Sequence, residues 1–269
     1  MTRPLVMGVV NVTPDSFSDG GLFLDSAAAV DHARGLIVQG ADILDIGGES
    51  TRPYAAPVSE AEEIARVVPV IRTLRDRATL SIDTMKPAVA RAAVAAGAGI
   101  WNDVTALRGA PDSLDVAAAL GCEVVLMHML GEPGTMQNDP RYDEVVGEVA
   151  AFLHGRAQAA IAAGVARERI SLDPGIGFGK TLAHNLALLA HLDRILALGF
   201  PVVLGVSRKS FLAKIDPSAK LATDRLGGSL AAALAGAAAG VQVLRVHDVR
   251  ETVQALAVAA AISGAGAGA

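Results

Sequence analysis

The sequence predicts an α/β fold, a single-domain (β/α)8 barrel over residues 1–269, and three observations lead there. Short runs rich in valine, isoleucine and leucine alternate with helical patterns about eight times, the number of units in such a barrel. The runs are apolar throughout, as is typical of parallel strands covered on both faces. Polar side chains follow nearly every run, and in a barrel they would project from the C-terminal rim, where this fold builds active sites. A doubly wound open sheet stays the alternative, because the same alternation would serve it.

Each strand is predicted at a short apolar run and each helix at a longer stretch with helical patterning. The strands are expected at 5–10, 43–46, 80–83, 100–104, 124–127, 170–173, 202–205 and 242–246. The helices are expected at 26–39, 60–77, 87–96, 112–120, 143–163, 184–198, 223–239 and 249–262. Several helices end at a glycine, which left-handed C-terminal positions favour. The Gly/Ala-rich tail at 264–269 is expected to fray.

Composition narrows the class of protein. Apolar residues make up 52% of the chain, more than a disordered protein carries. No apolar run approaches the roughly 18 residues of a membrane span, and no cleavable N-terminal segment is evident. The net charge is −5 and the basic residues are dispersed, which argues against a nucleic-acid partner. Cys122 is the only cysteine and is expected to be a buried thiol. We therefore expect a cytoplasmic protein that binds no membrane.

The segment 11–21, after the first strand, is longer than the roughly 2–6 residues that a plain connection needs. Asn11 stands at the predicted strand end. Groups that bind oxygen anions and metals then follow at Thr13, Asp15, Ser16, Ser18 and Asp19. A surface loop is the alternative, but the density of these groups favours a functional loop.

A second polar segment, 45–53, follows the next strand. Its paired glycines allow close approach of backbone or ligand, and Asp45 and Glu49 add charge at the strand end. Thr51 and Arg52 are suited to an anion, Arg52 through a bidentate fork. A turn with a solvated arginine is the alternative.

Three further strands end in side chains that suit a planar heterocycle, namely Asp83, Asn102 and Asp173. A carboxylate pairs with two N–H donors on one ring edge, and an amide supplies both a donor and an acceptor. Each residue alone could be a strand-end cap. Their coincidence at one rim is what favours a binding site.

The segment 173–180 looks like a phosphate loop, but Pro174 stands where that motif needs a glycine, which excludes a nucleoside triphosphatase. Its glycines are expected to shape a wall on which Phe178 packs. The segment 205–210 comes close to a nucleophile elbow, yet Lys209 replaces the closing glycine. Lys209 is therefore either a Schiff-base lysine or a charged donor to a ring nitrogen or carbonyl.

The last strand ends in Arg245, and alternation places His247 on the same side of the chain. Together they suit a phosphate or diphosphate, and the guanidinium can stack on a flat ring. The alternative is an Arg–Asp ion pair at the rim, in which Asp248 would take part. His128 lies in an apolar run and is expected to be a core residue.

These stretches occur in one order along nearly the whole chain: Asn-Val-Thr-Pro-Asp-Ser-Phe-Ser-Asp-Gly-Gly, Asp-Ile-Gly-Gly-Glu-Ser-Thr-Arg-Pro, Ser-Ile-Asp-Thr, Asn-Asp-Val, Met-His-Met, Asp-Pro-Gly-Ile-Gly-Phe-Gly-Lys, Ser-Arg-Lys-Ser and Arg-Val-His-Asp-Val. Together they resemble dihydropteroate synthase. Tyr54 departs from the glycine that often follows Arg-Pro in that family.

The resemblance implies that 4-aminobenzoate and 6-hydroxymethyl-7,8-dihydropterin diphosphate are joined to give 7,8-dihydropteroate and diphosphate, with Mg²⁺ as cofactor and commonly a homodimer. It implies these binding residues: Asp83, Asn102, Met127, Asp173 and Lys209 for the pterin, Thr51, Arg245 and His247 for the diphosphate or pterin side, Asn11 for Mg²⁺ or diphosphate, and Thr13, Pro53, Phe178 and Ser210 around the aminobenzoate. The catalytic set would be Asp83, Asp173, Lys209, Arg52 and Asp19.

The chemistry of the arylamine gives a mechanistic hypothesis. It is a weak nucleophile, so we expect an SN1-like substitution in which diphosphate departs first and no covalent enzyme intermediate forms. Three other activities stay open: a catalytically silent pterin-binding relative, a pterin-dependent methyltransferase, and a barrel aldolase that uses Lys209.

Overall fold

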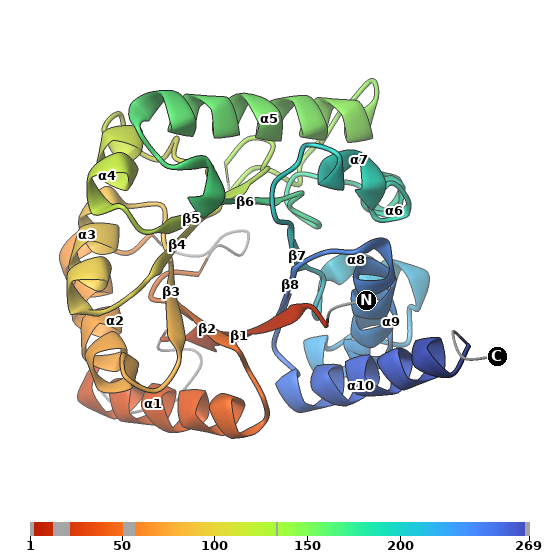
Figure 1. Ribbon diagram of the computed structural model, residues 1–269, viewed down its shortest axis with the longest axis horizontal. Helices are drawn as coiled ribbons and strands as arrows, with labels where there is room; N and C mark the ends of the chain where they lie inside the picture. Colours follow the sequence, from red (N-terminus) through yellow and green to blue (C-terminus); the bar gives the residue numbers. More distant parts are fainter. Residues whose placement is uncertain (1–2, 13–21, 51–56, 133, 267–269) are drawn as a thin grey trace.

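The computed structural model describes residues 3–12, 22–50, 57–132 and 134–266. Its eight strands form one sheet in the order β6-β5-β4-β3-β2-β1-β8-β7, and all paired strands are parallel. The first strand lies between the second and the eighth, so the sheet curls round on itself (Figure 1). A bridge between Leu172 and Val202 joins the two ends of the sheet. The (β/α)8 barrel is confirmed, and the open doubly wound sheet is wrong because β1 and β8 are neighbours.

The strands occur where apolar runs predicted them, with small shifts at their ends. They are β1 (Leu5–Asn11), β2 (Ile43–Gly47), β3 (Thr79–Asp83), β4 (Ile100–Asp103), β5 (Glu123–Met127), β6 (Ile170–Asp173), β7 (Val203–Gly205) and β8 (Val243–Val246). The helices are α1 (Leu22–Val38), α2 (Glu60–Leu74), α3 (Pro87–Ala96), α4 (Ser113–Leu120), α5 (Val145–Ala163), α6 (Leu182–Ala190), α7 (Leu192–Leu196), α8 (Ser210–Ile215), α9 (Leu226–Ala239) and α10 (Val249–Gly266).

Four helical regions differ from the predictions. The helix expected at 184–198 is two helices, because His191 leaves the helical conformation at φ −122° and ψ 38°. The short helix α8 was not predicted, since its six residues are too few to show a periodic pattern. The helix expected at 223–239 begins as a 3₁₀ turn over Ala222–Arg225. At the end of the chain, α10 continues past the predicted residue 262 to Gly266, so the expected fraying from 264 is wrong for residues 264–266.

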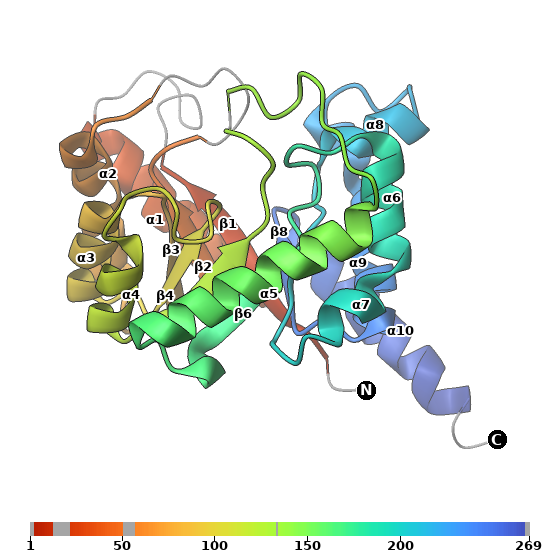
Figure 2. The same ribbon diagram turned by 90° about the horizontal axis from the view of Figure 1, so that it is seen from above.

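The core has two layers. The larger lies between the strands and the helices that surround them (Figures 1 and 2). The smaller fills the inside of the barrel with inward side chains from six strands: Met7, Ile43, Ile100, Val125, Val203 and Val243. In Figure 2, α8, which directly follows β7, lies at one end of the barrel, and the last turns of α10 lie at the other. The end with α8 is thus the C-terminal rim. Among the described helices, none combines the length and apolar character that crossing a membrane demands.

Helix α9 packs closely against the barrel at Gly236. A Cβ atom at Gly236 would overlap Leu204 Cδ2, and Leu204 is fully buried on β7. By contrast, a Cβ atom at Gly155, in the middle of α5, would meet nothing within 4 Å. The two positions form a matched pair of helical glycines that differ in packing.

We predict that Gly236→Ala destabilises the protein by about 1–3 kcal/mol, the usual cost of overpacking a core. Gly155→Ala should instead stabilise it by up to about 1 kcal/mol, because alanine has the higher helix propensity. Urea denaturation followed by circular dichroism measures both. Equal effects of the two substitutions would contradict the packing described for α9.

Candidate active site

The parallel register gathers polar side chains at the C-terminal rim. Asp83 pairs with Asn102 across β3 and β4, and Met127 pairs with Asp173 across β5 and β6. Arg245 pairs with Gly205 across β7 and β8. These side chains line one pocket at the rim. The full lining is Asp83, Asn102, Val104, Met127, Asp173, Gly175, Ile176, Phe178, Gly205, Lys209 and Arg245.

One arginine connects two carboxylates in this pocket. Arg245 donates through Nε to Asp45 Oδ2 at 2.6 Å and through Nη2 to Asp83 Oδ2 at 2.7 Å. The Asp45 side chain is fully buried, and that of Asp83 is 13% exposed. Burial opposes the charge of Arg245, but the two carboxylates outweigh it and raise its pKa. The guanidinium keeps further N–H donors beyond these two.

Asn102 is oriented from below by Asp45. Its Nδ2 donates to Asp45 Oδ2 at 3.0 Å, and the residue is 5% exposed. The sequence predicted that Asn102 would offer both a donor and an acceptor to a ring. In the structure Asp45 engages one of the two N–H donors of this amide, which leaves the other N–H and the amide oxygen to meet a ligand.

Asp173 and Lys209 form the opposite side of the pocket. Asp173 Oδ1 accepts from Gly175 N at 2.6 Å. Lys209 Nζ lies 4.0 Å from the centroid of the Phe178 ring, a cation–π contact. The pocket therefore holds a second pair of opposite charges, with Phe178 beside it.

The electrostatics reflect this burial. Burial raises the pKa of Asp83, and Arg245 opposes that rise. Burial likewise raises the pKa of Asp173, against the Gly175 hydrogen bond and Lys209. Burial and the charge of Arg245 lower the pKa of Lys209 to about 8. A ligand that brings N–H donors would therefore favour the charged forms of Asp83 and Asp173, and an anionic ligand would favour the charged form of Lys209.

The glycine-rich segment 174–179 forms one wall, as predicted, and Lys180 holds it. Lys180 is 1% exposed, and its Nζ lies 2.9 Å from both His128 Nδ1 and Gly175 O. It also donates to Phe178 O at 3.0 Å. Gly175 has φ +66°, and a Cβ atom there would overlap His128 O. The prediction that His128 is a core residue is confirmed, since it is 5% exposed.

His247 lies next to this pocket but outside its lining. Its backbone N donates to Ser207 Oγ at 3.2 Å, and its Nδ1 lies 3.1 Å from the same oxygen. Burial, followed by the charges of Arg245, Arg208 and Lys209, lowers the pKa of His247 to about 3. The ring is therefore neutral at pH 7.

Two other rim residues, Ser210 and Asp248, lie outside the pocket lining. Ser210 begins α8 and is exposed, outside the pocket lining. Asp248 does form an ion pair at the rim, but its partner is Arg208 and not Arg245: Arg208 Nε donates to Asp248 Oδ2 at 3.0 Å.

Five predicted site residues, Thr13, Asp19, Thr51, Arg52 and Pro53, lie outside the described residues. Asn11, the predicted metal ligand, is half-buried at the end of β1, in register with Gly47. No group of three or more His, Cys, Asp or Glu residues in the described part of the chain is arranged to hold a metal. The amide oxygen of Asn11 alone does fit Mg²⁺, because this ion usually keeps several waters and takes oxygens from substrate phosphates.

Comparisons with known proteins agree with this geometry. Residues 7–247 match the family model described as pterin binding enzyme. The dihydropteroate synthase of Escherichia coli is 46% identical over 96% of this chain and 91% of its own length. That of Neisseria meningitidis serogroup B is 50% identical over 96% and 92%. This chain belongs to the dihydropteroate synthase family.

Solved structures of dihydropteroate synthases share the fold closely. The Xanthomonas albilineans enzyme with 4-aminobenzoic acid has a TM-score of 0.91 and 52% identity, covering 97% of this chain and 93% of that chain. The same enzyme in complex with 7,8-dihydropteroate has a TM-score of 0.88 and 50% identity, covering 97% and 94%. The resemblance inferred from the sequence is confirmed.

Sequence reasoning missed some of the residues that shape the pocket. Asp45 was noted only as a charge, although it lies two residues after the inward Ile43 and must also face the barrel interior. Val104 and Ile176 were passed over as apolar, yet they follow Asn102 and Asp173 within the same segments. Lys180 was read only as the end of a rejected motif.

Buried Lys180 makes a testable contribution to stability. Burial and the charge of Lys209 lower its pKa to about 7, whereas Asp173 opposes this; the ordinary value is 10.5. Between these values the unfolded chain binds more protons, so stability from this residue rises with pH. We predict that the unfolding free energy of the wild type, minus that of Lys180→Met, increases by about 2 kcal/mol from pH 7 to pH 9. Urea titrations at both pH values measure it, and a pH-independent difference would refute the assignment.

Proposed function

We propose that this chain performs the reaction of its family, joining 4-aminobenzoate to 6-hydroxymethyl-7,8-dihydropterin diphosphate to give 7,8-dihydropteroate and diphosphate, a transferase step of folate biosynthesis. The observation that carries the proposal is the pocket in which Asp83, Asn102 and Asp173 face Lys209 and Arg245. A flat ring with amino and amide groups offers the donors that two carboxylates accept, and the acceptors that a lysine meets.

The pterin roles follow from these positions. Asp83 and Asp173 accept N–H groups of the ring, and Lys209 donates to a ring nitrogen or carbonyl. Asn102 meets the ring through its amide oxygen and through the N–H that does not bind Asp45. Met127, which is 4% exposed at the pocket, supplies an apolar contact to the ring face.

The departing diphosphate meets the cationic side of the rim. Arg245 and His247 bind it. An anion beside His247 would offset the effect of the cationic neighbours on its pKa and would favour protonation of the ring. Asn11 would hold Mg²⁺, which supplies further charge neutralisation to the diphosphate when it is bound. Thr51, Arg52, Asp19 and Thr13 act on the same groups or on the aminobenzoate, with Pro53, Phe178 and Ser210 around the second substrate.

The charge distribution supports a dissociative substitution. Departure of diphosphate leaves positive charge on the pterin methylene and ring. Asp83 and Asp173 hold that ring and so favour the charge, while Arg245 draws on the leaving anion. The arylamine nitrogen then forms the C–N bond to the methylene and releases one proton to solvent. This route needs no covalent bond to Lys209, whose role is binding; its Nζ lies over the Phe178 ring.

The primary test is turnover. Pterin diphosphate with 4-aminobenzoate should release diphosphate in equal amount to dihydropteroate, and only when Mg²⁺ is present. Release without dihydropteroate, or none at all, would refute the assigned reaction. Borohydride should trap no adduct on Lys209, whereas a trapped adduct would favour the aldolase chemistry.

Asp83→Ala tests pterin recognition. The change removes an acceptor for two ring donors, each worth about 1.5–3 kcal/mol to a charged group, so affinity should fall on the order of 100-fold or more. Calorimetry with pterin-6-carboxylate, which carries the ring without diphosphate, measures it. Asp76→Ala is the matched control, since its side chain is 85% exposed. Unchanged affinity in Asp83→Ala would refute the role.

The other candidates explain less. A pterin-dependent methyltransferase would not need the anion-binding pair Arg245 and His247. A silent relative would be expected to lack some pocket residue, whereas every pterin-binding residue inferred from the sequence among the described ones is present at the rim. The cytoplasmic location stays a prediction from the sequence.

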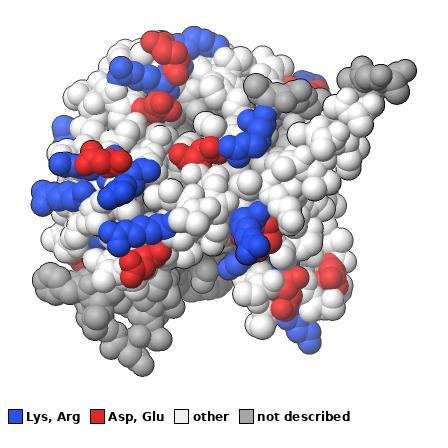
Figure 3. Space-filling model, turned by 60° about the horizontal axis from the view of Figure 1, so that its bottom comes forward, with Lys and Arg blue, Asp and Glu red and all other residues white. Residues whose placement is uncertain are grey.

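We further propose a homodimer formed through α10. From Thr252 to Gly266 this helix carries no charged residue, and in Figure 3 it forms an uncharged ridge. Val258 and Ile262, one helical turn apart, are 54% and 69% exposed. Exposed apolar side chains on one helix face are typical of an association surface. A twofold axis would bring two such helices together.

An acidic residue on this face should separate the subunits. We predict that Val258→Glu is monomeric at micromolar concentration in sedimentation velocity, while the wild type is dimeric. Val38→Glu, at the end of α1 and on an 89% exposed side chain, should leave the dimer intact. A monomeric wild type, or a dimeric Val258→Glu, would contradict the proposal.

A further inference from the structure

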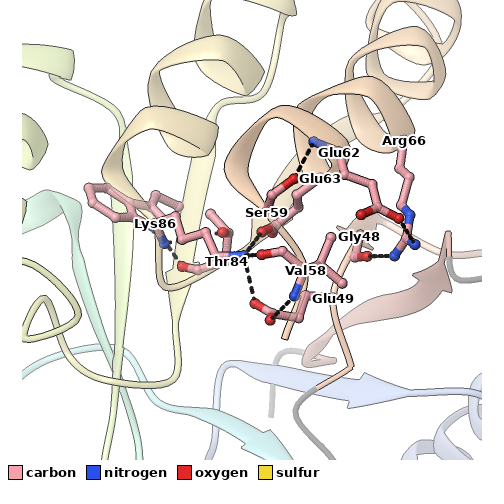
Figure 4. A network of polar contacts seen from close by, with 10 residues as sticks. Gly48, Glu49, Val58, Ser59, Glu62, Glu63, Arg66, Thr84 and Lys86 are labelled. Carbon is pink, nitrogen blue, oxygen red and sulfur yellow. Dashed lines mark hydrogen bonds and ion pairs between the residues drawn. The ribbon is translucent and has the colours of Figure 1, made fainter. Parts of the chain in front are cut away.

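A polar cluster outside the pocket joins three elements of the rim (Figure 4). We call it the stem clamp; it consists of Gly48, Glu49, Val58, Glu63, Arg66 and Lys86. Gly48 and Glu49 follow β2, Val58 precedes α2, and Lys86 stands just before α3. The clamp therefore lies at both ends of the segment 50–57, which connects β2 to α2.

Lys86 makes the central contacts of the clamp. Its Nζ donates to Val58 O at 2.6 Å and to Glu63 Oε2 at 2.7 Å, and it lies 3.0 Å from Glu49 Oε2. These are the three donors that an ammonium group has. Burial opposes its charge, but hydrogen bonds to Glu63 and Glu49 outweigh burial and raise the pKa of Lys86.

Glu49 and Arg66 complete the connection between the two ends. Glu49 Oε1 accepts from Val58 N at 2.9 Å, so both backbone polar groups of Val58 are held within the clamp. Arg66 Nη1 donates to Gly48 O at 2.7 Å. A Cβ atom at Gly48 would come within 2.9 Å of Glu63 Cγ, so the chain passes α2 there without room for a side chain.

The buried carboxylate of Glu63 requires a positive charge beside it in the clamp. Its side chain is 0% exposed, and among the described residues its Oε1 has no hydrogen-bond partner. A buried carboxylate without a counter-charge is strongly unfavourable, so Lys86 is needed where it stands. Glu63 also contributes to the raised pKa of Asp83, which lies three residues before Lys86. The clamp thus adjoins the pterin pocket without lining it.

We propose that Lys86 is a positioning residue, which fixes Glu49 and Val58 and so sets how the segment between them serves the arylamine substrate. The inference rests on the proposed function, because that function assigns Thr51, Arg52 and Pro53 of this segment to the diphosphate and 4-aminobenzoate. Lys86 itself touches neither substrate. Its loss should therefore affect the second substrate more than the binding of the pterin.

The test separates these two effects. In Lys86→Met, kcat/KM for 4-aminobenzoate should fall about 10–100-fold, the cost of a displacement near 1 Å at a reacting group. The Kd for pterin-6-carboxylate, measured by calorimetry, should change less than about 3-fold, which is under 1 kcal/mol. Lys86→Arg should recover part of the rate, because a guanidinium keeps a positive charge between Glu49 and Glu63. Lys220→Met, on an exposed lysine, is the control and should behave as wild type.

A second variant acts on the same connection without removing the buried cation. Glu49→Gln keeps the shape of the side chain but weakens its contact with Lys86, so it should show the same selective loss at smaller size. The double variant Lys86→Met/Glu49→Gln should be no worse than Lys86→Met alone, since both changes break one unit. If Lys86→Met does not fold, the selective loss in Glu49→Gln decides the matter.

Two results would overturn the inference. Wild-type kinetics in both Lys86→Met and Glu49→Gln would show that the clamp does not act on turnover. A loss of pterin affinity as large as the loss of kcat/KM would place the effect in the pterin pocket, through Asp83. The proposed function fails separately, if the wild type itself forms no dihydropteroate.

Discussion

The pocket depends on one cation held between two buried carboxylates. Asp45 is fully buried and Asp83 nearly so, and neither charge would be tolerated there without Arg245. The three residues come from β2, β3 and β8, and their contacts span β1. The ion cluster therefore fixes the relative positions of strand ends that are far apart in the sequence. It also gives the pocket a preformed acceptor edge at Asp83, with a donor directly beside it.

The same arrangement explains how recognition and chemistry share one pocket. Asp83 lies against Arg245 on one side, and Asp173 lies among Lys209 and Lys180 on the other, so each carboxylate is balanced by a cation. A heterocycle between them meets acceptors and donors that folding has already oriented. Charge that develops when an anion departs is then separated between groups already in place, which lowers the reorganisation needed during the reaction.

Much of this could be predicted from the sequence, and the limits have physical causes. Eight apolar runs predicted the barrel, and strand-end positions predicted Asp83, Asn102, Asp173 and Arg245 at one rim, because parallel strands bring their C-terminal ends together. The role of Asp45 was missed, since a carboxylate inside the barrel is identified only by the partner that neutralises it. The contacts of Lys86 could not be predicted either, because they join residues up to 37 positions apart through side-chain geometry. The break at His191 escaped because the apolar pattern continues across it.

The junction between β6 and β7 has a thermodynamic consequence. It is the one place where the described sheet is closed by an isolated bridge, Leu172 with Val202, and not by a paired strand. Asp173 ends β6 and Lys209 follows β7, so the two stand on opposite sides of this seam. A ligand bound by both residues would link β6 to β7 across this junction. Its binding free energy would then add to the free energy of unfolding of the barrel. Bound substrate would then stabilise the barrel at the junction where the described strands are joined only by an isolated bridge.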